Sequence, residues 1–450
     1  MNAINDPAAT PASRVAALRQ ELEAGHDLGG FVNESNNHIH TIYSFSPYSP
    51  SMAALRGREA GLQVVGSVDH DSVGAAWEMR EASALLGMGA VTGFEVRVML
   101  HSLADVEAGN APFAGRKLNN PDSAGVAYMT VQGVPAASRR VFDDFLRPIR
   151  QRRVERTRRM AEAANEILAG LGAPTFDFDT DVLGISQYAA GGTVTERHLL
   201  FAMSTALISG FGRGQALLDG LGSMGLALAD EQRVRLGDAQ NQFLAYDLLG
   251  TLKAEYLGRF YIQPSYFELG GELPDAVSVV DLALANGAIP CYAYLGDVSA
   301  SPTGDKKAEK FEDEFLDELI VTLGGLGFPA ITYMPPRNTP EQLVRISELS
   351  AANGLIEVSG VDINQPRQGF NCPELAEPRF DHLNTATWAM VAHETLSNLD
   401  LRLGLLHVDN PLRELTLIQR IARYAAVGPR LVSGAPASEI AAELTEGALS

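Results

Sequence analysis

Histidine and acidic side chains recur where the predicted strands of this chain end. The stretch "NNHIHTIYSFSPYSP" (36–50) contains His38 and His40, which are two residues apart. Alternate residues of a strand point to the same face, so both imidazoles can be presented to one metal ion. A lone His-x-His pair is more often two ordinary surface or core histidines, and a metal site therefore needs further ligands.

Three other segments carry suitable groups. The sequence "VDHDS" contains Asp69, His70 and Asp71, "GFEVR" contains Glu95, and "SGVDINQPRQ" contains Asp362. Each lies at the end of a predicted strand, and the carboxyl ends of parallel strands meet at one edge of an α/β fold. Imidazole together with carboxylate favours zinc, manganese or iron over calcium. Glu95 is suited to bridge two ions, and Asp69 and Asp71 are suited to orient the ligands.

The elements that must position these groups alternate between strand and helix. Residues 49–61 predict a helix that starts at Pro50 and stops at Gly61, and the runs 62–68 and 90–96 predict buried strands. The alternation returns after about residue 261 and predicts a parallel sheet or barrel. Between 138 and 257 helical patterns dominate, which indicates an insertion. We therefore divide the chain into an N-terminal helix (1–30), a first barrel part (31–135), a helical insertion (136–262), a second barrel part (263–400) and a C-terminal helical extension (401–450).

Charge and composition restrict the function. The 450 residues carry a formal net charge of −20, which argues against binding of long nucleic acid or of an anionic membrane surface. Cys291 and Cys372 lie outside any CxxC motif and imply no disulfide framework. With no signal-peptide pattern and no apolar run long enough to span a membrane, we expect a cytoplasmic protein. The sequence leaves the oligomeric state open.

Arginines cluster between Arg147 and Arg159 in this acidic chain. Such a run usually marks a solvent-exposed helix face, and we interpret it so.

Taken together, "HIHTIYS", "VDHDS", "GFEVR" and "SGVDIN" resemble, in order and spacing, the motifs of the PHP (polymerase and histidinol phosphatase) superfamily of metal-dependent phosphoesterases. The segments "IRQRRVERTRRM" and "TVTERHLL" resemble the helical insertion of the branch that hydrolyses small phosphate esters. The resemblance covers roughly residues 31–370.

The resemblance implies a distorted seven-stranded (β/α) barrel interrupted by a helical insertion. It implies phosphate contacts from Arg197 and His198 and a catalytic role for His70, either as a second metal ligand or as a proton donor to the leaving group. The metal ligands that it implies are His38, His40, His70, Glu95 and Asp362.

Several positions depart from the family pattern. Phe45 replaces an aspartate, and Tyr294 and Asn364 replace histidines. His101 is a possible stand-in ligand, although an ordinary buried or surface histidine is the more common case. We place Tyr294, Asn364 and Arg367 among the substrate-binding candidates, with Asp297, Lys306 and Lys307 as further polar residues of a loop at the same rim.

The leading hypothesis is therefore hydrolysis of a small phosphorylated substrate, such as a nucleotide or sugar phosphate, by a metal-activated water. A phosphate-binding or regulatory module on a decayed PHP scaffold is the alternative. A polymerase-linked nuclease fits poorly with the acidic charge, and hydrolysis of a non-phosphate bond stays open.

The ligand count predicts one tightly bound divalent ion and at most one weaker second ion, because a tyrosine and an asparagine bind such ions less well than imidazole. Elemental analysis of protein purified without chelator should give about one equivalent. His38→Ala or Asp362→Ala should abolish it, and Asn364→His should strengthen the weak site. Three tight ions in the unmodified protein would contradict this ligand count.

Overall fold

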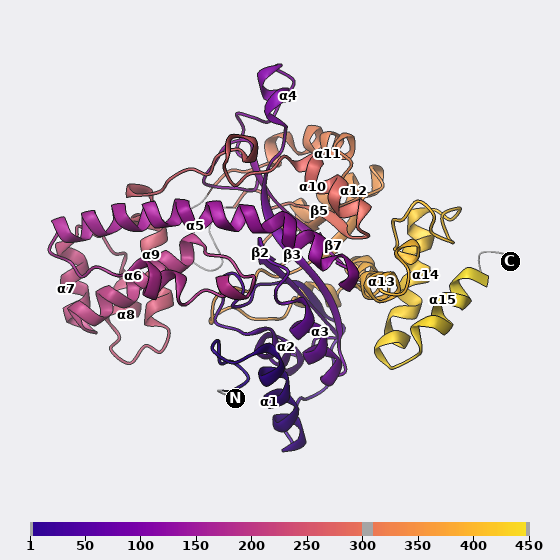
Figure 1. Cartoon of the computed structure of the whole chain (residues 1–450), viewed down its shortest axis with the longest axis horizontal. Coiled ribbons are helices and arrows are strands. Elements are labelled where there is room, and N and C mark those ends of the chain that lie inside the picture. Colours follow the sequence, from indigo (N-terminus) through magenta and orange to yellow (C-terminus); the bar gives the residue numbers. More distant parts are fainter. Residues whose placement is uncertain (1–2, 299–308, 447–450) are drawn as a thin grey trace.

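The strands of the described chain form a single seven-stranded sheet in the order β1 to β7. The sheet lies at the centre of the molecule (Figure 1). The structure is a computed structural model, and it describes residues 3–298 and 309–446. The strands are β1 (Ser35–Ile39), β2 (Val64–His70), β3 (Gly89–Met99), β4 (Val126–Gln132), β5 (Ile289–Ala293), β6 (Ala330–Tyr333) and β7 (Ile356–Ser359).

The two outer strands approach each other, so the sheet is a nearly closed barrel. Just beyond β1 and β7, the backbone N–H of His40 donates to the carbonyl of Ile363 at 3.0 Å, and the N–H of Ile363 donates to the carbonyl of His38 at 3.1 Å. Neighbouring strands are parallel except at β4, which runs antiparallel to both β3 and β5. This architecture confirms the distorted barrel. The alternation of strand and helix did not predict β4, because the connection from β3 is a long loop rather than a crossover helix.

Helices surround the barrel, and the predicted ends of the helix that starts at Pro50 are confirmed. Thr10 accepts a hydrogen bond from the N–H of Ser13 at the start of the first helix, and Ser49 accepts one from Met52 at the start of the second. The helices flanking the barrel are α1 (Pro11–Glu23), α2 (Pro50–Glu59), α3 (Ala76–Leu85), α4 (Leu103–Glu107), α10 (Ala276–Ala285), α11 (Leu316–Gly325) and α12 (Pro340–Ala352).

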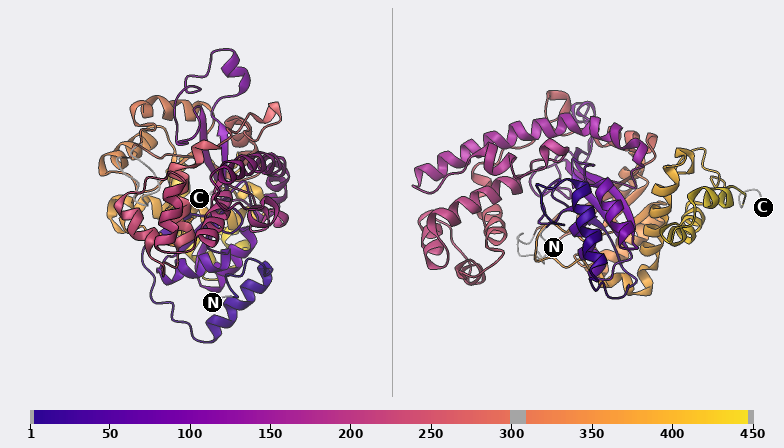
Figure 2. Two further views of the ribbon diagram at one scale, coloured as in Figure 1. Left: turned by 90° about the vertical axis from the view of Figure 1, so that its left-hand side faces the viewer. Right: turned by 60° about the horizontal axis from the view of Figure 1, so that its bottom comes forward.

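The helical insertion lies between β4 and β5. It comprises α5 (Arg139–Gly170), α6 (Glu196–Phe211), α7 (Gln215–Ser223), α8 (Asp230–Gly237) and α9 (Leu244–Glu255). Figure 2 shows that α5 runs from beside the barrel to the far end of the insertion, with the shorter helices beneath it. These helices bury a hydrophobic core of their own, to which Phe45 of the barrel rim contributes.

The interpretation of the arginine cluster as an exposed helix face is wrong for part of it. Arg150, Arg153 and Arg156 are buried, whereas Arg147 and Arg152 are exposed. The buried arginines recur every three residues, so they share the side of α5 that faces the barrel. Their charges are compensated by acidic groups, described below.

The C-terminal helices α13 (Asp381–Ser397), α14 (Leu417–Val432) and α15 (Ala437–Glu446) pack together at the right of Figure 1. They share a hydrophobic core with residues of the strands, including Val64, Val91 and Ile356. None of the helices in residues 3–298 and 309–446 is long and apolar enough to cross a membrane.

A buried histidine joins α13 to the loops around it. The N–H of Leu405 donates to Nδ1 of His393 at 2.8 Å, and Nε2 lies 3.2 Å from the carbonyl of Gly133. Burial lowers the pKa of His393 to about 4, so the ring is neutral near pH 7. Nδ1 then accepts and Nε2–H donates.

The free energy of unfolding should therefore fall as the pH drops from about 6.5 to 4. The unfolded chain takes up a proton near 6.5, and folded His393 does so only near 4, so proton binding favours the unfolded state by up to about 3 kcal/mol across this window. His393→Gln cannot charge, and urea titrations at several pH values should show a shallower decline for it. An equal slope in both proteins would contradict this assignment.

Candidate metal centre

The predicted ligands come from four strands, or from residues that closely follow them, on one side of the barrel. Glu95 does not end its strand as expected, because β3 continues to Met99. His38 lies on β1 and His40 follows it, His70 is the last residue of β2, and Glu95 is paired in register with His70 on β3. Asp362 follows β7.

A glycine allows the end of β7 to approach β1. A Cβ atom at Gly360 would lie 2.5 Å from Cβ of His38 and 2.8 Å from its backbone nitrogen. A side chain at this position would push the two strand ends apart. The absence of one lets Asp362 reach the histidines of β1.

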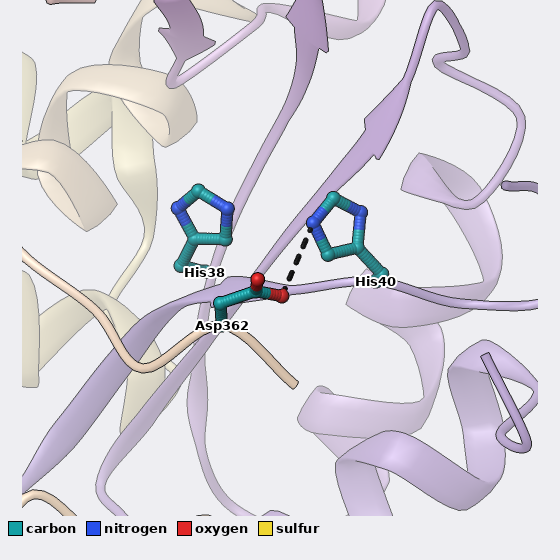
Figure 3. A group of neighbouring side chains, drawn as sticks. All are labelled: His38, His40 and Asp362. Carbon is teal, nitrogen blue, oxygen red and sulfur yellow. Dashed lines mark ion pairs between the residues drawn. The ribbon is translucent and has the colours of Figure 1, made fainter. Parts of the chain in front are cut away.

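His38, His40 and Asp362 form the first of two candidate ligand groups, with one ligand atom of each residue within 4.8 Å of those of the others (Figure 3). Nε2 of His40 lies 3.5 Å from Oδ1 of Asp362. Two atoms that bind one tetrahedral ion at about 2.1 Å lie about 3.4 Å apart. The separation of these two ligand atoms therefore suits a shared divalent ion.

His40, His70 and Glu95 form the second group. Oε2 of Glu95 lies 2.9 Å from Nδ1 of His70 and 3.7 Å from Nε2 of His40, while Oε1 lies 3.7 Å from Nε2 of His38. Glu95 thus stands between the two groups, as a bridging ligand would. The direct hydrogen bond to His70 already occupies one of its oxygens.

The ring of His40 is oriented by the loop that follows β1. Ser44 donates its hydroxyl proton to Oδ1 of Asp69 at 2.7 Å, and its oxygen lies 3.3 Å from Nδ1 of His40. Because the serine proton points to Asp69, Nδ1–H of His40 must be the donor to Ser44, which leaves the Nε2 lone pair facing the carboxylates. Asp69 thus orients a ligand indirectly, as the sequence predicts.

The protonation states also suit a cation. Burial, followed by the charge of His70, lowers the pKa of His40 to about 3, so this imidazole is neutral and able to bind a metal. Burial alone would raise the pKa of Glu95, but the neighbouring histidines, His70 first, lower it to about 2. The pKa of Asp362 is likewise lowered, against burial, by His40 and His38. Two ionised carboxylates beside a neutral imidazole attract a divalent ion.

A cavity of about 140 Å³ lies between this rim and the insertion. All five predicted ligands line it, and so does Arg197 of α6. Arg153, Lys253 and Arg337 also line the cavity. The position of these three residues on the cavity depends on how the insertion and the loop after β6 pack, which the sequence does not reveal.

His198 does not line this cavity. Its Nδ1 accepts a hydrogen bond from the N–H of Thr195 at 3.0 Å and so caps α6, and its ring packs edge-to-face against Phe45 at 5.0 Å. Burial and the charge of Arg153 lower its pKa to about 3. The geometry gives His198 the role of holding the first turn of α6, which carries Arg197, rather than that of the predicted phosphate contact.

Tyr294 and Asn364 line the cavity, but their polar groups bind neighbouring acids. The hydroxyl of Tyr294 donates to Asp313 at 2.6 Å, and burial raises its pKa. The amide of Asn364 donates to Oδ1 of Asp362 at 2.5 Å, so this residue supports a ligand. Each residue can contact a substrate only with atoms that do not take part in these hydrogen bonds.

Arg367 lies outside the cavity lining, contrary to the substrate contact that we expected. Its Nε and Nη2 donate to both oxygens of Asp247 on α9, at 3.0 and 2.9 Å, and its guanidinium also contacts Asn241 at 3.1 Å. Arg367 therefore ties the loop after β7 to the insertion.

The remaining candidates have other surroundings. His101 stacks on Phe113 at 6.0 Å, away from both ligand groups, and Asp297 accepts a hydrogen bond from the N–H of Phe311. Lys306 and Lys307 lie outside the described residues.

No family model matches the chain, and no curated protein matches it. Among solved structures, a candidate metal-dependent phosphoesterase from Bifidobacterium adolescentis is 18% identical, with a TM-score of 0.46, over 76% of this chain and 93% of that one. An amidohydrolase from Chromobacterium violaceum, with bound sulfate and no metal, is 17% identical, with a TM-score of 0.46, over 75% of this chain and 90% of that one. Both likenesses are too distant to bear on the activity of this chain.

The bond between Arg367 and Asp247 predicts energetic coupling between two residues that are far apart in sequence. Arg367→Met and Asp247→Asn should each lower the free energy of unfolding, and the double variant should lose less than the sum. Arg367 is half exposed, so the coupling energy should be about 0.5–1 kcal/mol, measured by chemical denaturation. Strict additivity would show that the contact contributes nothing.

Proposed function

We propose that this chain is a metal-dependent hydrolase of a small phosphate ester and a divergent member of the PHP superfamily. The observation that carries the proposal is the cavity with two chemically opposite walls. Histidines and carboxylates of the barrel rim form one wall, and the cationic residues Arg197, Lys253 and Arg337 contribute to the lining from the insertion and the loop after β6. Such a site suits a phosphoryl group held between a divalent ion and guanidinium groups.

The donor set fits a divalent ion of the zinc, manganese or iron type. His38, His40 and Asp362 would hold it, with Glu95 shared toward His70. When bound, such an ion supplies Lewis-acid chemistry toward water and phosphoryl oxygens.

The side chains of the protein perform the other steps. Arg197 binds the phosphoryl oxygens with its planar guanidinium and so orients the ester against the ligand wall. His70 donates Nδ1–H to Glu95, and the carboxylate of Glu95 stabilises the positive charge that a second proton on this ring brings. His70 can then release a proton from Nε2 to the leaving oxygen. Leu200, Leu257 and Met334 in the lining exclude water from this exchange.

A second candidate function is phosphate binding without turnover. It is favoured by the hydrogen bonds of Tyr294 to Asp313 and of Asn364 to Asp362, which occupy two positions where the family has histidines. Thermal stabilisation of the metal-loaded protein by inorganic phosphate, without hydrolysis of any ester, would support this candidate over catalysis.

Turnover of mononucleotides, histidinol phosphate and sugar phosphates by the metal-loaded protein tests the proposal. His40→Ala should reduce kcat at least about a hundredfold because it removes a metal ligand from both groups. Arg197→Met should raise KM about tenfold or more because it removes a phosphate contact. Arg158→Met, which removes an exposed arginine of the insertion paired with Asp179, is the matched control and should change neither value. Activity no higher than that of His40→Ala on every ester would refute catalysis.

A further inference from the structure

Six charged residues join the insertion to the barrel beside the cavity. Arg153 and Arg156 of α5 and Glu196 of α6 come from the insertion. Asp71 after β2, Arg97 of β3 and Glu272 before α10 come from the barrel parts of the chain. Five of them are buried, and the side chain of Glu196 is 15% exposed. Three cations face three anions, so the group is electrically balanced.

Arg153 bridges the two walls of the cavity at the turn that follows β2. Its Nη1 donates to Oδ2 of Asp71 at 2.5 Å, and its Nη2 donates to Oε2 of Glu196 at 3.0 Å. One rigid, planar guanidinium therefore connects the end of β2 with the first residue of α6. Its side chain and that of Asp71 are each only 3% exposed, so water screens the contact between them little.

Asp71 is the direct neighbour of His70, and its backbone is constrained. It has φ of +49°, and no other non-glycine residue of the described chain has a positive φ. Its N–H donates to the carbonyl of Glu95 at 2.7 Å, and its own carbonyl accepts from Arg150 at 3.0 Å. A non-glycine residue keeps this left-handed backbone conformation only when the surrounding contacts hold it there. Contacts of α5 thus fix the turn that directs His70 toward Glu95.

Glu196 is the partner of Arg153 on the insertion wall of the cavity. It is the first residue of α6 and directly precedes Arg197. Besides Arg153, it accepts a hydrogen bond from Arg156 at 2.6 Å and pairs with Arg97 at 3.4 Å. These two arginines would hold Glu196 in place if Arg153 were removed, so the loss of Arg153 would remove specifically the link between α6 and the turn at Asp71.

We infer that Arg153 is a positioning residue that sets the distance between His70 on the metal side and Arg197 on the insertion side of the cavity. The inference rests on the proposed function, because it assumes that both residues act on one phosphoryl group. In addition to packing, the buried arginines of α5 would then fix the positions of the residues that contact the substrate. Without Arg153 the group keeps one uncompensated negative charge beside a cavity that must accept an anion.

Binding of inorganic phosphate to the metal-loaded protein, measured by calorimetry, tests this inference. Arg153→Met should weaken phosphate binding about tenfold or more, with metal content unchanged by elemental analysis. Arg153→Lys keeps the charge but cannot bridge two carboxylates as a fork, so it should recover only part of the affinity. With an ester that turns over, both variants should raise KM more than they lower kcat. Arg152→Met is the control, since Arg152 is exposed on the same helix and pairs only locally with Glu155.

The outcomes separate the two proposals. If the unmodified protein binds phosphate but hydrolyses no ester, the proposed catalysis fails and the phosphate data still decide the role of Arg153. Phosphate affinity within twofold of the unmodified protein for Arg153→Met or for Arg153→Lys would overturn the inference, since in the second case charge alone suffices. Absence of phosphate binding by the unmodified protein would also overturn it.

A second variant covers the case in which Arg153→Met does not fold, as judged by circular dichroism. Asp71→Gly removes the same contact from the barrel side, and glycine tolerates φ of +49°. It should weaken phosphate binding about fivefold or more with metal content unchanged. Unchanged affinity would overturn the inference.

Discussion

The contact between the end of β7 and β1 is the constraint on which the candidate site depends. His38, His40, His70 and Glu95 lie within the first hundred residues, but Asp362 comes from a segment more than 260 residues away from Glu95. The backbone hydrogen bonds between Ile363 and β1 bring that segment into place, and Gly360 permits the close approach. If the sheet stayed open at this seam, the first ligand group would lose its carboxylate and keep only two imidazoles.

The site contains ionised groups whose charged forms burial alone would disfavour. Carboxylates at the rim stay ionised because imidazoles lie beside them, and the arginines of α5 stay charged because Asp71, Glu196 and Glu272 face them. Buried ion pairs of this kind are weak evidence for stability, since desolvation offsets much of their attraction. Their arrangement around one cavity is better explained by the need to place opposite charges at fixed positions.

Two polar residues of the rim have a similar structural role. Tyr294 turns its hydroxyl toward Asp313, and Asn364 turns its amide toward Asp362. In both cases a polar group of the rim donates a hydrogen bond to an acid of the protein itself. Arg367 shows the same tendency, since it pairs with Asp247 of the insertion rather than facing the cavity. These contacts hold the loops of the rim to one another and to the insertion.

The sequence by itself determined the class of the fold, the ends of one barrel helix and the strands that carry ligands. These features are local, because capping residues, hydrophobic period and the His-x-His spacing act within a few residues. Only the tertiary structure decided which polar side chains face the cavity. Arg153 and Arg158 belong to the same arginine cluster, yet the first is buried against Asp71 and the second is exposed beside Asp179. Likewise Arg197 lies in the cavity, whereas its neighbour His198 caps the helix. Such differences depend on how α5 and α6 pack against the barrel, and contacts between residues distant in the chain leave no periodic signal in the sequence.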